Sequence, residues 1–198
     1  MLALMIMGST ESTSRKPRAE SRRRLRWRDG VAKSRLIPRN GKSYFGDGKL
    51  ERVWQHPDKL RVEIAYPSHI EVRDVDGDRG TQNRMKATGV ALDAMRLQAA
   101  RLAIPILLVE KKSELKTAGP NSIEIPVSGD LTVTIDVDPA TGHILKSTGK
   151  AVGVDFSTTY SDFRNVDGLL FAFREANTAQ GTATGTNEIS KVEISLRK

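Results

Sequence analysis

The sequence contains no cysteine among its 198 residues. That absence excludes a disulfide framework, a thiolate nucleophile and a zinc site with cysteine ligands. No apolar stretch approaches the roughly 20 residues that a membrane-spanning helix needs. The short apolar run from Leu2 to Met7 has no Lys or Arg before it and no small-residue cleavage pattern after it, so residues 1–8 are at most a degenerate signal peptide.

Catalytic and metal-binding motifs are also missing. The three histidines, His56, His69 and His143, are far apart and occur in none of the H-x-x-x-H or H-E-x-x-H spacings of zinc sites. No G-x-S-x-G elbow or glycine-rich phosphate loop is present. The acidic run at 74–78 lacks the sixth-position glycine and twelfth-position glutamate of a calcium loop. We therefore expect a protein that is not an enzyme and that uses neither a metal nor a cofactor.

Positive charge is in excess, with 32 Lys and Arg against 24 Asp and Glu. The excess lies in residues 1–43, which hold 12 basic and 3 acidic residues, whereas the rest of the chain holds 20 and 21. The arginines at 22–28, with Trp27 among them, are of a kind that can bind RNA or anionic lipid. Because charge runs are usually solvated tails, we predict instead that residues 1–43 are mostly disordered.

From Tyr44 onward, apolar residues alternate with polar ones. Leu60, Val62 and Ile64 alternate with the charged residues Lys59, Arg61 and Glu63. This period of two turns one side of a strand inward and the other toward water. The same alternation recurs at residues 70–73, 131–138 and 191–196. Turn residues separate the runs, so the pattern predicts eight to ten strands in a meander, sandwich or barrel.

One segment has a different character. Residues 89–103 are rich in good helix formers and poor in β-branched residues. Pro105 ends this helix, because the residue before a proline avoids the helical region, and it can begin a second helix that runs to Leu115. The sequence thus predicts a pair of helices inserted at about 89–116.

Four segments, taken in order, resemble the motifs of one family. They are VWQHPDKLRVE at 53–63, VDGDRG at 75–80, IDVDPATGHIL at 135–145 and YSDFRNVDGLLFAF at 160–173. Together they resemble the outer-membrane lipoprotein carrier (LolA/LolB-like) superfamily, in its broader lipoprotein-sorting-protein branch, over about residues 44–198. The N-terminal helix and first strand of that family have no evident counterpart in residues 1–43.

The resemblance implies a mainly β fold with an α lid, in which an antiparallel, unclosed half-barrel sheet carries two short helices over its concave face. Family members shelter acyl chains or other lipophilic groups in the periplasm, so it also implies a periplasmic location. In the lipoprotein carriers an arginine before the proline of the first motif latches the lid. Here His56 stands at that position, and we take His56 and Arg61 as the candidates for a lid latch.

The leading hypothesis is a non-enzymatic carrier for a lipophilic ligand, meaning a lipid or the acyl chains of a lipoprotein, in the cell envelope, with a membrane or envelope protein as a transient partner. Burial of the chain at about 0.8 kcal/mol per CH₂ would supply the affinity. The expected cavity residues are Leu60, Val62, Ile64, Val72, Met95, Leu97, Val133, Ile135, Phe156, Phe171 and Phe173. The alternatives are a binder of nucleic acid or of an anionic surface through residues 1–43, and an accessory module of an envelope peptidase system.

Overall fold

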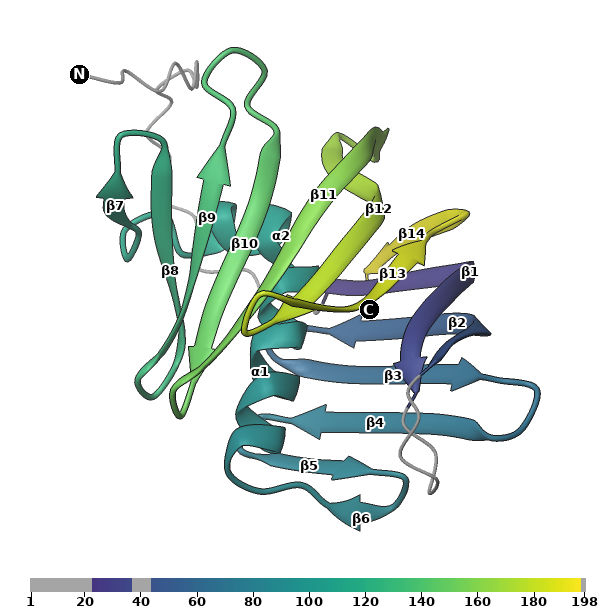
Figure 1. Ribbon diagram of the computed structural model, residues 1–198. Helices are drawn as coiled ribbons and strands as arrows, with labels where there is room; N and C mark the ends of the chain where they lie inside the picture. Colours follow the sequence, from purple (N-terminus) through teal and green to yellow (C-terminus); the bar gives the residue numbers. More distant parts are fainter. Residues whose placement is uncertain (1–22, 37–43, 197–198) are drawn as a thin grey trace.

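A computed structural model describes residues 23–36 and 44–196 (Figure 1). In this part of the chain a single antiparallel sheet of fourteen strands curves around two helices. The helices are α1 (Val90–Leu102) and α2 (Ile104–Glu110). The strands are β1 (Arg23–Leu36), β2 (Tyr44–Gln55), β3 (Lys59–Ala65), β4 (Ile70–Asp76), β5 (Arg79–Gln82), β6 (Met85–Lys86), β7 (Lys116–Gly119), β8 (Ser122–Ser128), β9 (Leu131–Val137), β10 (Ile144–Ala151), β11 (Val154–Val166), β12 (Leu169–Ala179), β13 (Thr182–Glu188) and β14 (Lys191–Leu196).

The order of the strands shows that the sheet is open, with two edges. Neighbours follow the path β6-β5-β4-β3-β2-β1-β13-β12-β11-β10-β9-β8-β7, and β14 pairs with β1 beside that path. Figure 1 shows two limbs, one formed by β1 to β6 and the other by β7 to β12, with the helices between them. The short strands β6 and β7 are the two edges, and the helices connect one edge to the other in sequence. This is the unclosed half-barrel with a helical lid that the resemblance implies.

Strand β1 is an ordered part of the segment 1–43, which is predicted to be mostly disordered; the rest of that segment lies outside the described residues. Leu25 and Trp27 are 0% and 3% exposed and belong to the hydrophobic core. The alternating Arg26 and Arg28 form ion pairs with carboxylates on β2 and β14. Arg24, Arg26 and Arg28 are therefore one side of an ordinary alternating strand, and Trp27 is not available for stacking on a nucleic-acid base.

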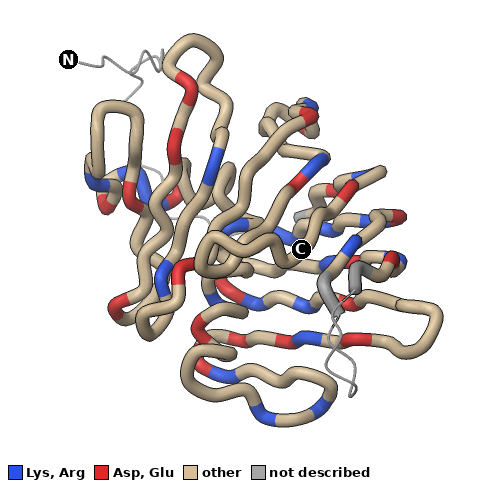
Figure 2. Tube along the Cα trace, in the orientation of Figure 1, with Lys and Arg blue, Asp and Glu red and all other residues tan. Residues whose placement is uncertain are grey.

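The same strand moves the domain boundary. The domain includes at least residues 23–36 in addition to the predicted 44–198, and β1 pairs with β2, β13 and β14 in the middle of the sheet. The short segment predicted as a degenerate signal peptide lies outside the described residues. Figure 2 shows both signs of charge spread over both limbs of the sheet, as expected for a folded part that is close to neutral.

Helix α1 packs against both limbs, touching β4 and β5 on one side and β8, β9 and β10 on the other. Two glycines allow this close approach. A Cβ at Gly149 would lie 2.8 Å from Leu97 Cδ2, and one at Gly80 would lie 2.9 Å from Leu92 Cδ1. A methyl group at either position would force the leucine to shift, so glycine on each limb lets the helix lie close to the sheet.

Helix α2 follows α1 almost without a break. Pro105 stands in its first turn, where the missing N–H of proline is not needed, as the sequence predicts. The helix ends at Glu110 and not at Leu115, so it is shorter than expected. In the described ranges neither helix is long and apolar enough to cross a membrane.

Candidate functional site

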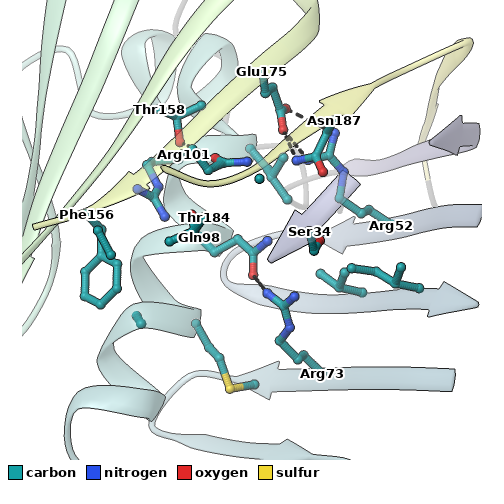
Figure 3. A pocket seen from close by; sticks show the side chains of 18 of the residues that line it. Ser34, Arg52, Arg73, Gln98, Arg101, Phe156, Thr158, Glu175, Thr184 and Asn187 are labelled. Atoms are coloured by element: carbon teal, nitrogen blue, oxygen red, sulfur yellow. Dashed lines mark hydrogen bonds and ion pairs between the residues drawn. The ribbon is translucent and has the colours of Figure 1, made fainter. Parts of the chain in front are cut away.

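Two adjoining cavities lie between the helices and the curved sheet. The polar cavity, about 490 Å³, is bounded by α1, by β2 to β4 and by β11 to β13 (Figure 3). The apolar cavity, about 640 Å³, is bounded by α2 and by β8 to β12. Both volumes are within the range of about 300–1,000 Å³ that is usual for small-molecule sites. The described residues that line both cavities are Arg101, Leu102, Tyr160 and Glu175.

Hydrogen-bonded polar pairs line the polar cavity. Arg73 on β4 donates to Gln98 of α1 over 3.0 Å and to Glu71 over 2.7 Å. Figure 3 shows Gln98 reaching from the helix toward Arg73. On the opposite wall, Thr158 donates to Asn177 over 2.8 Å. The cavity therefore offers hydrogen-bonding groups from both limbs of the sheet and from the helix between them.

A buried ion pair closes the end of the polar cavity. Arg52 on β2 makes two hydrogen bonds to Glu175 on β12, of 2.8 and 3.1 Å, and the residues are only 1% and 6% exposed. Asn187 donates a third hydrogen bond to Glu175, of 2.8 Å, and the Arg52 guanidinium lies 5.2 Å from the ring centre of Trp27. Two strands, β1 and β13, separate β2 from β12 in the sheet, so the pair spans the concave face and ties the limbs together.

Arg101 and Tyr160 stand where the cavities meet. The Tyr160 hydroxyl lies 2.7 Å from the hydroxyl of Ser147, and burial raises the pKa of Tyr160 to about 12. Burial lowers the pKa of the Arg101 guanidinium, against the opposing influence of Tyr160 and Glu175. No carboxylate oxygen of the described residues lies within 4.0 Å of Arg101, so its charge is not neutralised in an ion pair there.

The apolar cavity is lined by helix α2 and by the inner ends of several strands. Its aliphatic and aromatic lining is made of Trp27, Leu102, Ile104, Pro105, Leu108, Val109, Leu115, Ile123, Val137, Ile144, Phe163, Leu169, Leu170 and Phe171. Val109 and Leu170 are 60% and 37% exposed, so the apolar lining continues to the protein surface. Such a space favours a chain of methylene groups over a polar ligand.

The predicted cavity residues have three different placements. Those that line a cavity are Val62, Ile64, Met95 and Phe156 in the polar cavity and Phe171 in the apolar one. Leu97 of α1 and Val133 and Ile135 of β9 are fully buried core residues, and Leu60 and Phe173 are buried outside both cavities.

Val72 differs from the expectation, because it is not on the concave face. The register pairs Val72 with Glu63, whereas Val62 pairs with Arg73 and Ile64 pairs with Glu71. Side chains directly opposite each other share a face, so Glu71 and Arg73 are the inward residues of β4. A search for apolar residues misses them, although their alternation with the buried Val75 indicates the face.

The two latch candidates, His56 and Arg61, have different positions in the structure. His56 Nε2 lies 3.2 Å from Glu110 Oε2 at the end of α2, so His56 joins the sheet to the lid. Arg61 instead pairs with Glu63 and Asp74 on the outer face of β3 and β4. The structure therefore places His56, and not Arg61, at the lid. In the described ranges no group of three or more His, Asp and Glu is placed to hold a metal ion.

No model of a protein family matches the sequence, and neither does any curated protein. Among solved structures, a LolA superfamily protein from Nitrosomonas europaea is similar with a TM-score of 0.52 and 12% identity, over 91% of this chain and 88% of that one. A DUF1329 family protein from Desulfovibrio piger has a TM-score of 0.47 and 12% identity, over 88% and 86% of the two chains. The first likeness shows that this chain has a LolA-like fold, as the sequence motifs predict.

Proposed function

We propose that this protein is a non-enzymatic carrier that binds a lipid, with an acyl chain in the apolar cavity between helix α2 and the sheet. The observation that carries the proposal is that cavity, which is about 640 Å³ in volume, has a mainly aliphatic and aromatic lining and opens beside Val109 and Leu170. The polar cavity next to it provides room for a head group. An amphiphile thus matches the two spaces together better than a purely polar or purely apolar ligand.

The size of the effect can be worked out from the chain length. Burying ten methylene groups is worth about 8 kcal/mol and burying fifteen about 12 kcal/mol. Association costs at least about 4 kcal/mol. A chain that buries fifteen methylenes is therefore expected to reach at best micromolar affinity, which corresponds to about −8 kcal/mol, whereas one that buries ten is expected to be at best near millimolar. A steep dependence on chain length is the signature of this kind of site.

The setting of this activity belongs to the same proposal. The LolA-like fold supports a carrier that works in the cell envelope, in the periplasm, and that receives its ligand from a membrane or an acylated protein as a transient partner. The alternative of nucleic-acid binding through the arginines near Trp27 has less support, because Trp27 is in the core and Arg26 and Arg28 are paired with carboxylates.

The test is native mass spectrometry of the purified protein, followed by titration with fatty acids of increasing length. We expect a co-purified lipid, or binding that tightens by orders of magnitude between ten and sixteen carbons. Ala172 lines the apolar cavity, so Ala172→Phe should weaken the binding of long chains. Ala118→Phe on the edge strand β7, at an exposed position outside both cavities, is the matched control. Absence of bound lipid together with no dependence on chain length would disprove the proposal.

A further inference from the structure

The charges around the polar cavity do not balance. Three arginines of the described residues line it, and two of them are held by carboxylates, Arg52 by Glu175 and Arg73 by Glu71. The third, Arg101, has no carboxylate of the described residues within 4.0 Å. One positive charge is therefore left over, and it stands at the boundary that the two cavities share.

Arg101 is only half-buried by its exposed surface, and a partly desolvated cation without a counter-charge is costly for a protein to keep. The pKa of Arg101 is lowered by its burial, which is the direction expected for a guanidinium that lacks a close anionic partner, although an arginine stays protonated at neutral pH. Figure 3 shows the side chain extending from α1 into the space near Thr158 and Phe156. The guanidinium is thus presented to the cavity, and an anion bound there would compensate it.

We propose that Arg101 binds the anionic head group of the lipid, a carboxylate or a phosphate, while the acyl chain lies in the apolar cavity beside it. The inference rests on the proposed function and narrows its ligand to anionic amphiphiles. The position at the shared boundary supports this pairing of head and chain, because a ligand that spans the boundary has its polar end on Arg101 and its chain among the residues of α2. The planar guanidinium also matches a carboxylate or a phosphate with two parallel hydrogen bonds.

The first arm of the test uses the unaltered protein and ligands that differ only in the head group. Hexadecanoate, hexadecyl phosphate and hexadecanol carry the same chain, and their dissociation constants are measured by calorimetry or by native mass spectrometry. We expect at least one of the two anionic ligands to bind about tenfold more tightly than the alcohol, since a charge-assisted pair at a desolvated site is stronger than a neutral one. Comparing the two anions separates a fatty acid from a phospholipid as the source, and inorganic phosphate alone shows whether the chain is required.

The second arm changes the charge. Arg101→Gln should weaken the binding of the anionic ligands much more than that of hexadecanol and so remove the tenfold preference, and Arg101→Lys should keep part of the preference. The control is Arg96→Gln on the same helix, because Arg96 lines neither cavity and is paired with Asp93 at 3.5 Å. If Arg101→Gln fails to fold, the head-group series on the unaltered protein still decides the matter.

The outcomes separate the two proposals. Equal affinity for hexadecanol and for both anions, or an unchanged preference in Arg101→Gln, would overturn the role of Arg101 and leave the lipid carrier standing. If none of the sixteen-carbon ligands binds, the proposed function itself fails, and the role of Arg101 fails with it.

Discussion

Breaking the Arg52–Glu175 pair should cost much of the stability of the fold. Glu175→Leu removes a carboxylate that accepts two hydrogen bonds from Arg52, of 2.8 and 3.1 Å, and leaves a guanidinium that is 1% exposed without its counter-charge. Removing one partner of a buried pair costs about 3–5 kcal/mol, against a total of about 5–15 kcal/mol for a typical domain. We therefore expect Glu175→Leu and Arg52→Met each to lower the free energy of unfolding by about 3–5 kcal/mol.

The double variant is the informative one. With both charges gone, no buried charge is left uncompensated, and replacing a whole buried pair by apolar residues of similar size is often close to neutral. The double variant should thus be more stable than either single variant, with a coupling energy of several kcal/mol in a double-mutant cycle measured by urea unfolding.

An exposed pair provides the matched comparison. Arg61 and Asp74 approach to 2.9 Å, much as the buried pair does, but their side chains are 50% and 45% exposed. Removing Arg61 should cost no more than about 1 kcal/mol. The reasoning is refuted if the loss on removing Glu175 is as small as that, or if the double variant is as unstable as the sum of the single variants.

Three further predictions concern the lid and the boundary between the cavities. Gly149→Ala would place a methyl group 2.8 Å from the fully buried Leu97, so it should lower the free energy of unfolding by about 1–3 kcal/mol. In a chain that already carries Leu97→Ala, the same change should cost less in a urea titration, because the methyl group then has room. His56→Ala removes the 3.2 Å contact with Glu110. Because that pair is partly exposed, the free energy of unfolding should change by less than about 1 kcal/mol, whereas amide hydrogen exchange in α2 should become faster. Unchanged exchange would refute the role of His56 as a latch. Burial raises the pKa of Tyr160 to about 12, so near pH 11 the folded state binds more protons than the unfolded state, whose tyrosine ionises near pH 10. The free energy of unfolding should therefore fall as the pH rises from 10 to 12, and Tyr160→Phe should reduce that slope.

The sequence predicts several strands of both limbs and the helical lid well, because the signals for these elements are local. The alternation around Leu60 and Ile64 gives β3, the hairpin residues at 138–142 separate β9 from β10, and Pro105 places the start of α2. These signals depend only on neighbouring residues. They are insensitive to which distant strand completes the sheet.

The failures have a physical cause as well. In β1, Leu25 and Trp27 are the inward residues. Their alternation with the outward arginines at 24, 26 and 28 is hard to recognise, because so many charges in a short stretch are typical of a solvated tail. The polar cavity is missed for the opposite reason, since Arg73 and Glu71 face inward where an apolar residue is expected. The link between Arg52 and Glu175, 123 residues apart, is set by the curvature of the whole sheet and has no local signal.

The helical lid is continuous with the sheet at both of its ends. It follows the edge strand β6 and precedes the other edge strand, β7, so it crosses the groove between the two edges of the sheet. A segment tied at both ends cannot swing outward about one hinge as a flap does. For a ligand to enter or leave, either the helices must shift sideways within their span or one of the short edge strands must peel away from its neighbour. The separation of the two limbs and the position of the lid are therefore expected to change together when a ligand enters the groove.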